Sequence, residues 1–400
     1  MVTAWVAAVL LATAVQAPGK AERRMLRADE FAILAWGWTT GDRQALDDMK
    51  ACGINLAGMV KAADLDQVQA AGMMALVWDA DAHVGDAEAN LPKAEVERRV
   101  KAAVDRVAGH PAVLGYYLRD EPSARVFPGI GVWADAYRRF APDKIAYVNL
   151  FPNYATSAQL GTDTYEQHLE EFVRHVRPRV ISYDHYALMD DGSLRDGYFQ
   201  NLEAVRRVAD KHRLPFWNIV LSNAHFHYAE PTAGGLRFQA YTTLAYGARG
   251  ISYFTYTAPA VGNYRLAPVD QFGNKTATWD MLRNVNLQIH ALGPTYIQLK
   301  SLGVVHHPNV PEGCRGISAA QHVAELSGGD LLAGEFDGPN GEPYALVVNK
   351  SLHRSTPYTV RFRQAGAVLQ VNAYTGAHEP WGGENGWLAP GQGMLLTVRK

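Results

Sequence analysis

The feature that most constrains the fold of this chain is an eightfold alternation of short apolar segments with amphipathic ones. Each apolar segment is rich in β-branched or aromatic residues, and a turn separates it from a stretch with helical spacing. Near-continuous hydrophobicity is typical of parallel strands that are covered on both faces. The eight apolar segments are residues 31–38, 54–60, 73–79, 112–118, 144–150, 179–186, 216–222 and 250–256.

The order and length of this pattern predict an α/β protein with a (β/α)8 TIM barrel over residues 28–294. The competing architecture is an open doubly wound sheet, which predicts a glycine-rich phosphate loop after an early strand. None of the first three segments ends in such a loop. The barrel is therefore the favoured architecture.

Residues 295–400 differ from the preceding part in hydrophobic spacing and composition, because helical spacing disappears and Gly, Pro and Asn become frequent. Short alternating runs separated by turns are typical of antiparallel strands. We therefore expect a small C-terminal antiparallel β-sandwich. The runs that indicate it are residues 344–349, 358–362, 369–374 and 393–398.

Residues 1–17 are expected to form a signal peptide. An apolar run over residues 4–15 is followed by Val15-Gln16-Ala17, a small-x-small pattern that suits cleavage before Pro18. The run carries no Lys or Arg before it, and it is too short to span a bilayer. We expect a secreted or periplasmic protein with no membrane segment in its mature form.

Charge and cysteine content exclude several classes of partner. The chain has 38 basic and 40 acidic residues, a net charge of −2, so neither nucleic acid nor an anionic membrane is expected. Cys52 and Cys314 lie far apart and support neither a disulfide framework nor a zinc site. His225 and His227 lack a third ligand, so we expect no metal and no cofactor. No feature indicates an oligomeric state.

The carboxyl ends of the strands carry the active site in a barrel of this type. The residues there are rich in carboxylates and aromatic rings and poor in phosphate ligands, which favours a carbohydrate substrate. Trp36, Trp38 and Trp78 are candidate sugar platforms. The full set of expected substrate contacts is Trp36, Trp38, Trp78, Asp79, Arg119, Asp120, Asn149, Tyr183, Tyr186, Asn223 and Tyr256.

Glu121 is the strongest candidate for a catalytic acid, because it follows the apolar fourth segment directly. The alternative is a solvated turn in which Pro122 starts a helix. Residues 110–122 (HPAVLGYYLRDEP) and 236–256 resemble the clan of family 42 β-galactosidases and their uncharacterised relatives. The resemblance implies a barrel glycoside hydrolase whose acid/base glutamate, here Glu121, ends strand four. Asp120 stands where that clan usually has asparagine.

The second carboxylate has two candidates. In the resembled clan it is a glutamate at the end of strand seven, where this chain has Ser222-Asn223-Ala224 and no acid. Asp184 follows the sixth segment directly and is slightly preferred by position, whereas Glu230 lies in the loop after the seventh. The main hypothesis is a glycoside hydrolase that acts on an oligo- or polysaccharide, either retaining or inverting according to the separation of its carboxyl groups. The missing glutamate motivates the alternative, a non-hydrolytic carbohydrate-binding barrel.

Overall fold

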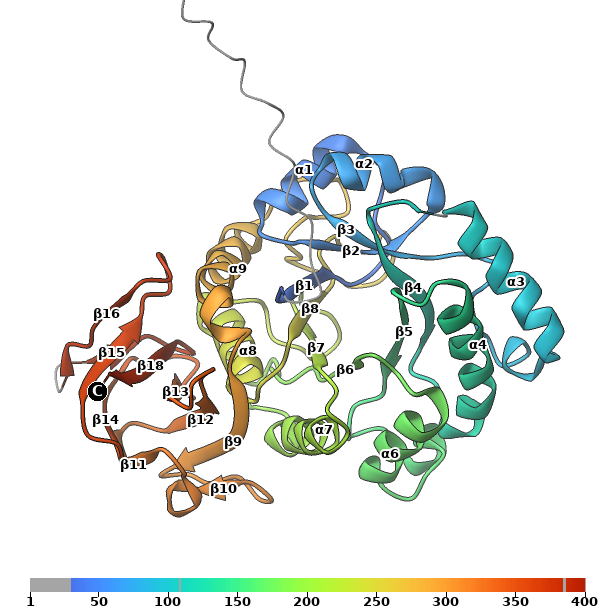
Figure 1. Ribbon diagram of the computed structural model, residues 1–400. Coiled ribbons are helices and arrows are strands. Elements are labelled where there is room, and N and C mark those ends of the chain that lie inside the picture. The colour runs from blue at the N-terminus through green and yellow to red at the C-terminus, as the bar shows by residue number, and fades with distance from the viewer. Residues whose placement is uncertain (1–29, 108, 384–385, 400) are drawn as a thin grey trace, which may run out of the picture.

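The computed structural model describes residues 30–107, 109–383 and 386–399. The expected signal peptide at residues 1–17 lies outside them. The predicted barrel is confirmed: eight parallel strands close on themselves, with β8 paired to β1 (Figure 1). These strands are β1 (Ala32–Ala35), β2 (Leu56–Val60), β3 (Met74–Val77), β4 (Val113–Asp120), β5 (Ile145–Leu150), β6 (Ile181–Asp184), β7 (Phe216–Leu221) and β8 (Gly250–Phe254).

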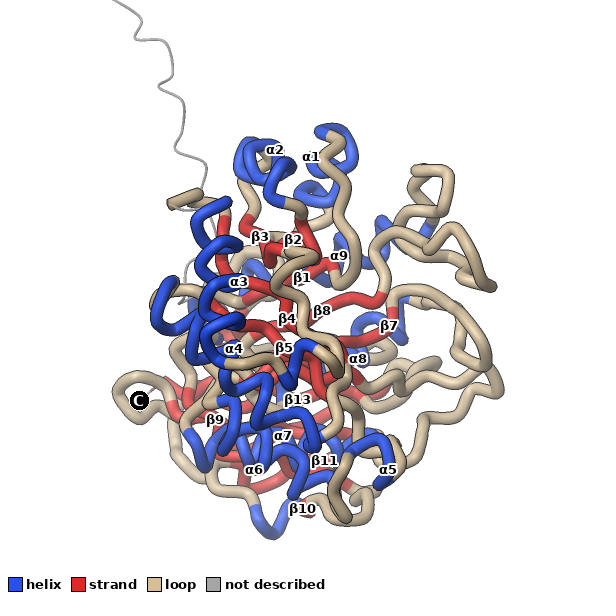
Figure 2. Tube along the Cα trace, turned by 90° about the vertical axis from the view of Figure 1, so that its right-hand side faces the viewer, coloured by secondary structure: helices blue, strands red, loops and turns tan. Residues whose placement is uncertain are grey.

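Helices surround the barrel strands, as Figures 1 and 2 show. Side chains cap several of them: Asp42 accepts a hydrogen bond from the Ala45 N–H, and Thr164 forms a reciprocal capping box with Gln167. The helices are α1 (Arg43–Ala51), α2 (Leu65–Ala70), α3 (Lys93–Arg106), α4 (Phe127–Phe140), α5 (Ser157–Leu160), α6 (Tyr165–Val176), α7 (Tyr198–His212), α8 (Ala233–Ala245) and α9 (Ala277–Tyr296).

The last barrel helix is longer than the sequence suggests. The Gly293-Pro294 pair indicates a helix end, yet α9 runs on to Tyr296. Pro294 lies in the final turn, where the ring removes one N–H donor but leaves few later helical residues to disrupt. The barrel portion therefore ends just before β9 (Lys300–His307).

A β-rich C-terminal part follows, as predicted. One sheet has seven strands in the order β10-β9-β12-β13-β18-β15-β16, and a second has three in the order β11-β14-β17. The pairing is antiparallel except between β9 and β10. These strands are β9, β10 (Arg315–Gly316), β11 (Val323–Gly328), β12 (Leu331–Asp337), β13 (Pro343–Asn349), β14 (Thr356–Phe362), β15 (Ala367–Val371), β16 (His378–Pro380), β17 (Trp387–Leu388) and β18 (Gly393–Arg399).

The C-terminal strands pack on the outside of the barrel against α8 (Figure 1). Gly334 of β12 allows this approach, because a Cβ there would meet the Ala245 carbonyl. Arg237 donates from Nε to the Pro390 carbonyl at 2.8 Å. Because the barrel covers one side of α8 and the sheet the other, nearly all of its side chains are buried. The two parts therefore share one continuous core.

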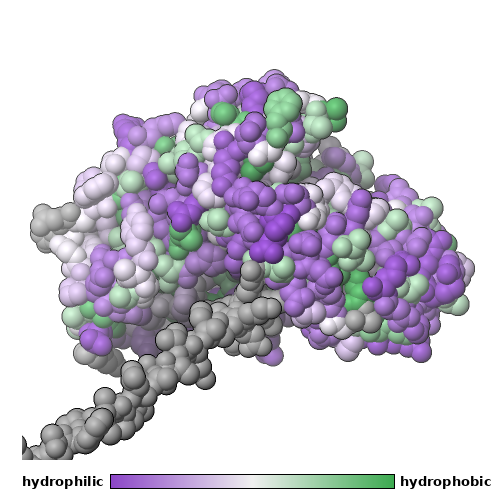
Figure 3. All heavy atoms as spheres, turned by 90° about the horizontal axis from the view of Figure 1, so that it is seen from above, coloured by the Kyte–Doolittle hydropathy of each residue, from purple (hydrophilic) through white to green (hydrophobic). Residues whose placement is uncertain are grey.

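The barrel interior is filled by side chains rather than left open. Leu34, Leu56, Leu76, Tyr147 and Trp217 form one buried cluster inside it. The face seen in Figure 3 is mainly hydrophilic, with hydrophobic residues in small separate patches. In the described part of the chain, no helix is both long and apolar enough to cross a membrane.

Candidate active site

Glu121 leaves β4 in a strained conformation. Its φ is +42°, in the left-handed region that residues with a side chain rarely adopt. Its N–H donates to the Asn149 carbonyl at 2.8 Å, which holds the backbone in place. Successive side chains of a regular strand point to opposite faces. The left-handed residue breaks this alternation, and the Asp120 and Glu121 carboxyl groups lie close enough for their charges to interact.

Two carboxyl groups accept hydrogen bonds from the side chain of Asn149, and a third, that of Glu121, interacts with both of them. Asn149 Nδ2 donates to Asp120 Oδ1 at 3.0 Å and to Asp184 Oδ1 at 2.9 Å. Asp184, at the end of β6, is 3% exposed and shares a hydrogen bond with Glu121. The structure therefore brings Asp120, Glu121 and Asp184 together, as their positions at the ends of β4 and β6 predict.

A hydroxyl pair fixes the orientation of the Asn149 amide. Ser182 Oγ donates to Asn149 Oδ1 at 3.2 Å, and the Tyr147 hydroxyl lies 2.7 Å from Ser182 Oγ. With its oxygen engaged in this way, Asn149 turns its NH2 group toward the carboxylates. Its role in this structure is to hold the acidic cluster together.

Burial raises the pKa of all three carboxyl groups. The pKa of Glu121 rises to about 7 through burial first and the charge of Asp120 second, against the hydrogen bond from Asp184. Burial raises the pKa of Asp120 to about 6, although Asn149 opposes the rise. Burial and the two neighbouring carboxylates raise the pKa of Asp184 well above its ordinary value. Glu121, with a pKa of about 7, therefore keeps its proton to a higher pH than Asp120, with a pKa of about 6.

Aromatic rings supply the apolar wall beside this cluster. Trp36 contacts Tyr117 edge-on at a centroid distance of 6.4 Å and Phe254 at 5.4 Å. Tyr186 stacks on Phe254 at 5.5 Å, and the charges of Asp184 and the other two carboxylates act on its hydroxyl. Trp36 and Tyr186 are only half-buried, so they present partly exposed ring surface. Two of the expected sugar contacts thus lie at one wall.

The other two candidate platforms contact each other. Trp38 meets Trp78 edge-on at 4.6 Å between ring centroids, and Trp38 is 58% exposed. Trp38 follows β1 and Trp78 follows β3, so both lie at the carboxyl ends of the strands. This pair, with Trp38 exposed and Trp78 half-buried, is suited to stacking on a ring that approaches from solvent.

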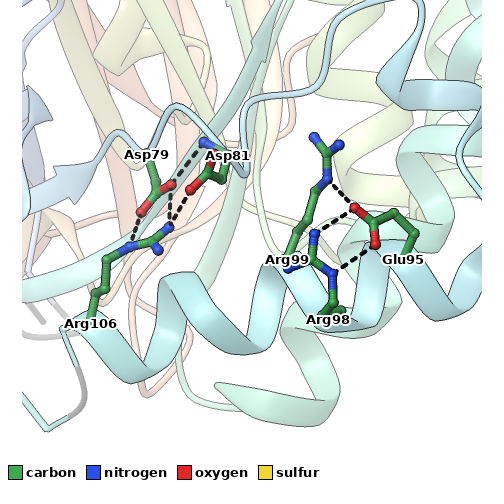
Figure 4. Close-up of polar contacts among 6 residues, drawn as sticks. All are labelled: Asp79, Asp81, Glu95, Arg98, Arg99 and Arg106. Carbon is green, nitrogen blue, oxygen red and sulfur yellow. Dashed lines mark hydrogen bonds and ion pairs between the residues drawn. The ribbon is translucent and has the colours of Figure 1, made fainter.

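Asp79 and Arg119 already have protein partners. Arg106 of α3 donates to both oxygens of Asp79 at 2.7 and 2.8 Å, and it also pairs with Asp81 (Figure 4). Arg119 pairs with Asp86 and donates to the Val84 carbonyl. In this structure the two residues therefore brace the loop after β3.

Tyr183, Tyr256 and Asn223 are buried within the protein. Tyr183 has no exposed surface and packs in the core outside the barrel, because it alternates with the inward-facing residues of β6. The Tyr256 hydroxyl accepts a hydrogen bond from Trp279 Nε1 at 3.0 Å. Asn223 Nδ2 donates to the Phe254 carbonyl at 2.8 Å, and its Oδ1 faces His225 Nδ1 at 2.9 Å.

Glu230, the alternative second carboxylate, lies apart from the cluster. It is exposed, and its Oε1 faces Arg265 Nε at 3.7 Å. Among the residues that the structure describes, Asp120 and Asp184 are the carboxylates whose charge or hydrogen bond acts on Glu121. The structure brings Asp184 to Glu121 and leaves Glu230 in an ion pair.

Phe226, in the loop after β7, is a candidate that the sequence analysis missed. Its φ is +47° and its side chain is 75% exposed, an unusual combination for a large aromatic residue. Its ring contacts His225 at 5.2 Å, and His225 in turn stacks on Tyr264 at 4.9 Å. The aromatic run from 225 to 228 is the sequence signal that points to this loop.

Metal-ligand clusters and cavities are the other features that could mark a functional site in the described residues. Residues 30–107, 109–383 and 386–399 contain no group of three or more His, Cys, Asp or Glu side chains that could hold a metal ion. One cavity of about 410 Å³ lies at the start of β7 and β8, beside Arg249 and Lys300. Another of about 430 Å³ lies between α7 and the C-terminal strands. Neither cavity includes the carboxyl cluster in its lining.

Comparisons with known proteins agree on the fold. Neither protein-family models nor curated proteins gave a match to this sequence. A family 42 β-galactosidase from G. stearothermophilus superimposes with a TM-score of 0.61 at 8% identity, over 94% of this chain and 99% of that one. A family 5 glycoside hydrolase from Bacteroides vulgatus gives 0.56 at 14% identity, over 94% and 92%.

A shorter match has the same architecture. A β-galactosidase from the psychrophilic Marinomonas ef1 aligns with a TM-score of 0.50 at 11% identity, over 65% of this chain. The present chain spans 60% of the length of that enzyme. At these identities the likeness shows a shared (β/α)8 fold.

Proposed function

We propose that this chain is a glycoside hydrolase that cleaves a glycosidic bond in an oligo- or polysaccharide, with Glu121 as general acid. The observation that carries the proposal is the position of Glu121, half-buried at the carboxyl end of β4, with its pKa raised to about 7. A carboxyl group with this pKa still holds a proton near neutral pH and can give it to the leaving oxygen. The aromatic wall of Trp36 and Tyr186 suits a sugar ring.

Asp184 is the natural partner of Glu121, but it lies too close for the role of nucleophile or base. Retaining hydrolases separate their two carboxyl groups by about 5–5.5 Å, and inverting ones by about 6.5–9.5 Å. The hydrogen bond between Glu121 and Asp184 implies a separation shorter than either of these ranges. We propose that Asp184 shares its proton with Glu121. Glu230 becomes the second carboxylate only if it leaves Arg265.

The comparisons support this class of reaction. Proteins described as a β-galactosidase and as a family 5 glycoside hydrolase share the fold over 94% of this chain. A common fold hosts many functions, so the proposal depends on the acidic cluster at the strand ends.

One observation favours a second candidate, a carbohydrate-binding barrel without hydrolysis. Asn223 occupies the end of β7, where the resembled clan carries a glutamate, and its amide is held by Phe254 and His225. A binding protein needs the aromatic platforms but not an ionised second carboxylate.

The test is a Glu121→Gln variant assayed on aryl glycosides and oligosaccharides, with release of reducing ends as readout. We expect turnover of oligosaccharides to fall by roughly 10²–10⁴-fold, the usual contribution of a general acid. Glu325→Gln is the matched control, because that glutamate forms an exposed pair with Arg361 in the C-terminal part. Wild-type turnover in the Glu121→Gln variant refutes the assignment. Glycan binding by calorimetry with no reducing ends from the parent protein supports the binding barrel instead.

A further inference from the structure

The acidic cluster contains a proton donor but lacks an opposed nucleophile. Asp184 is buried and hydrogen-bonded to Glu121, and Glu230 is paired with Arg265. The other carboxylate that acts on Glu121, in the part of the chain that the structure describes, is Asp120, its neighbour on β4. Conventional hydrolysis needs an ionised carboxylate on the far side of the sugar ring from the acid. Two groups from the same strand end cannot enclose the ring in this way.

Asp120 has one oxygen available for a ligand. Asn149 donates to its Oδ1 at 3.0 Å, and among the described residues no hydrogen bond reaches Oδ2. The residue is half-buried, and Oδ2 is not among the fully buried side-chain atoms that lack a partner. A partly desolvated carboxylate with a free oxygen is a strong acceptor for an N–H or O–H group. Asp120 directly precedes Glu121, and the charge of its carboxylate acts on the proton donor.

We propose that the substrate is a 2-acetamido-2-deoxy glycoside, that Asp120 binds its amide N–H, and that its carbonyl oxygen is the nucleophile. This inference rests on the proposed function and names its substrate class. An acetamido group on C2 brings its own oxygen to the far face of C1, so no opposed carboxylate is needed. The rings of Trp36, Tyr186 and Phe254 offer apolar surface for the acetamido methyl.

The reaction balances with the residues present. In the first step a lone pair of the acetamido oxygen forms a bond to C1, the bond from C1 to the leaving oxygen breaks, and Glu121 gives its proton to that oxygen. The charge that develops on the amide N–H is stabilised by the Asp120 carboxylate. In the second step water attacks C1 and gives a proton to Glu121, and the bond from C1 to the acetamido oxygen breaks. The net change is the addition of one water across the glycosidic bond.

The first experiment compares nitrophenyl 2-acetamido-2-deoxy glycosides with the matching 2-hydroxy glycosides and with N-trifluoroacetyl analogues, in both the gluco and galacto series. We expect cleavage of the acetamido compounds and a loss of kcat/KM on the order of tenfold or more with trifluoroacetyl, because fluorine withdraws electron density from the attacking oxygen. Equal or faster cleavage of the 2-hydroxy glycosides overturns the inference and leaves the proposed function standing. If the protein cleaves none of the glycosides or oligosaccharides tested, the proposed function fails as well.

The second experiment removes the charge of Asp120 with Asp120→Asn. We expect kcat on the acetamido substrate to fall by about 10²–10³-fold, as on removal of one electrostatic stabiliser of a transition state. A purely structural role would not change inhibition by a sugar-fused methylthiazoline, which mimics the cyclic intermediate; we expect the variant to bind it far more weakly. Asp105→Asn, in an exposed pair with Lys101 on α3, is the matched control. Unchanged inhibition in Asp120→Asn overturns the role given to Asp120.

Discussion

Glu121→Gln is expected to stabilise the protein at alkaline pH, although it removes the catalytic acid. Burial and Asp120 raise the pKa of Glu121 from 4.5 to about 7, so the folded state binds this proton more tightly than the unfolded state. The stability that the protonated group contributes is complete below pH 4.5 and is lost as the pH rises toward and through 7. Glutamine has nearly the shape of the protonated acid and cannot ionise, so the variant avoids this loss.

The magnitude follows from the same pKa values. Each pKa unit corresponds to about 1.4 kcal/mol, so ionisation of Glu121 lowers the free energy of unfolding by about 3 kcal/mol well above pH 7. Most of this loss develops between pH 5 and pH 8. Over that interval the stability of Glu121→Gln relative to the parent should therefore rise by about 2 kcal/mol.

Thermal unfolding checks this expected gain in stability. The midpoints are measured for the parent, Glu121→Gln and Glu325→Gln at pH 5 and pH 8, at constant ionic strength. We expect the two variants to behave alike at pH 5, and Glu121→Gln alone to gain about 2–3 °C at pH 8, because a chain of this size needs about 0.8 kcal/mol for each degree. The pair of Glu325 with Arg361 is exposed, so it serves as the reference for a surface carboxylate. A difference that does not vary with pH, or a loss of stability at pH 8, would refute the argument that the buried carboxylate is destabilising.

Three further changes probe other parts of the structure. Asp184→Ala removes the hydrogen bond that lowers the pKa of Glu121. In a plot of kcat/KM against pH, the fall on the alkaline side should therefore move to higher pH. The rise on the acid side, set by Asp120 near pH 6, should stay in place. Phe226→Gly removes an exposed ring and the backbone strain of a left-handed residue that has a side chain. KM for long oligosaccharides should rise, whereas KM for aryl monoglycosides should stay the same. The free energy of unfolding should not fall. Gly334→Ala forces a methyl group against the backbone of α8 and should lower the unfolding free energy by about 1–3 kcal/mol, measured by thermal unfolding.

The barrel was predictable because its signals are local, whereas part of the C-terminal region was not. Each barrel strand is a short apolar run, and an amphipathic helix follows most of them; α8 is an exception, because nearly all of its side chains are buried. The strands β9 to β12, β16 and β17 went unpredicted, and β12 illustrates one physical reason. It carries Glu335 at 2% exposure, between Gly334 and Phe336. The backbone N–H groups of Gln321, His322 and Val323 satisfy its carboxylate, and these partners become neighbours only in the folded chain.

The candidate site, too, could be predicted only in part. Glu121 follows from an apolar strand exit, which the sequence displays directly. The pairing of Asp79 with Arg106 depends on how α3 packs over the loop after β3, so residue types alone could not reveal it. Tyr183 and Asp184 are adjacent on β6, and alternation along a strand means that only one of them can face the interior of the barrel. Applied strictly, that rule would have removed Tyr183 from the expected contacts.

The energetics of the cluster bear on the choice between a hydrolase and a binding barrel. Glu121 combines a left-handed backbone with a carboxyl group whose pKa burial and Asp120 raise to about 7, and both features oppose folding at neutral pH. A protein that only binds sugars gains nothing from a group that exchanges its proton near pH 7, since an amide in the same place would offer hydrogen bonds without the penalty. A catalyst needs such a group, because it must give up a proton and recover it in each turnover. The loss of stability that the acidic cluster causes is therefore better explained by proton transfer than by sugar binding. The Glu121→Gln variant tests both points in one protein, because its stability and its turnover can each be measured.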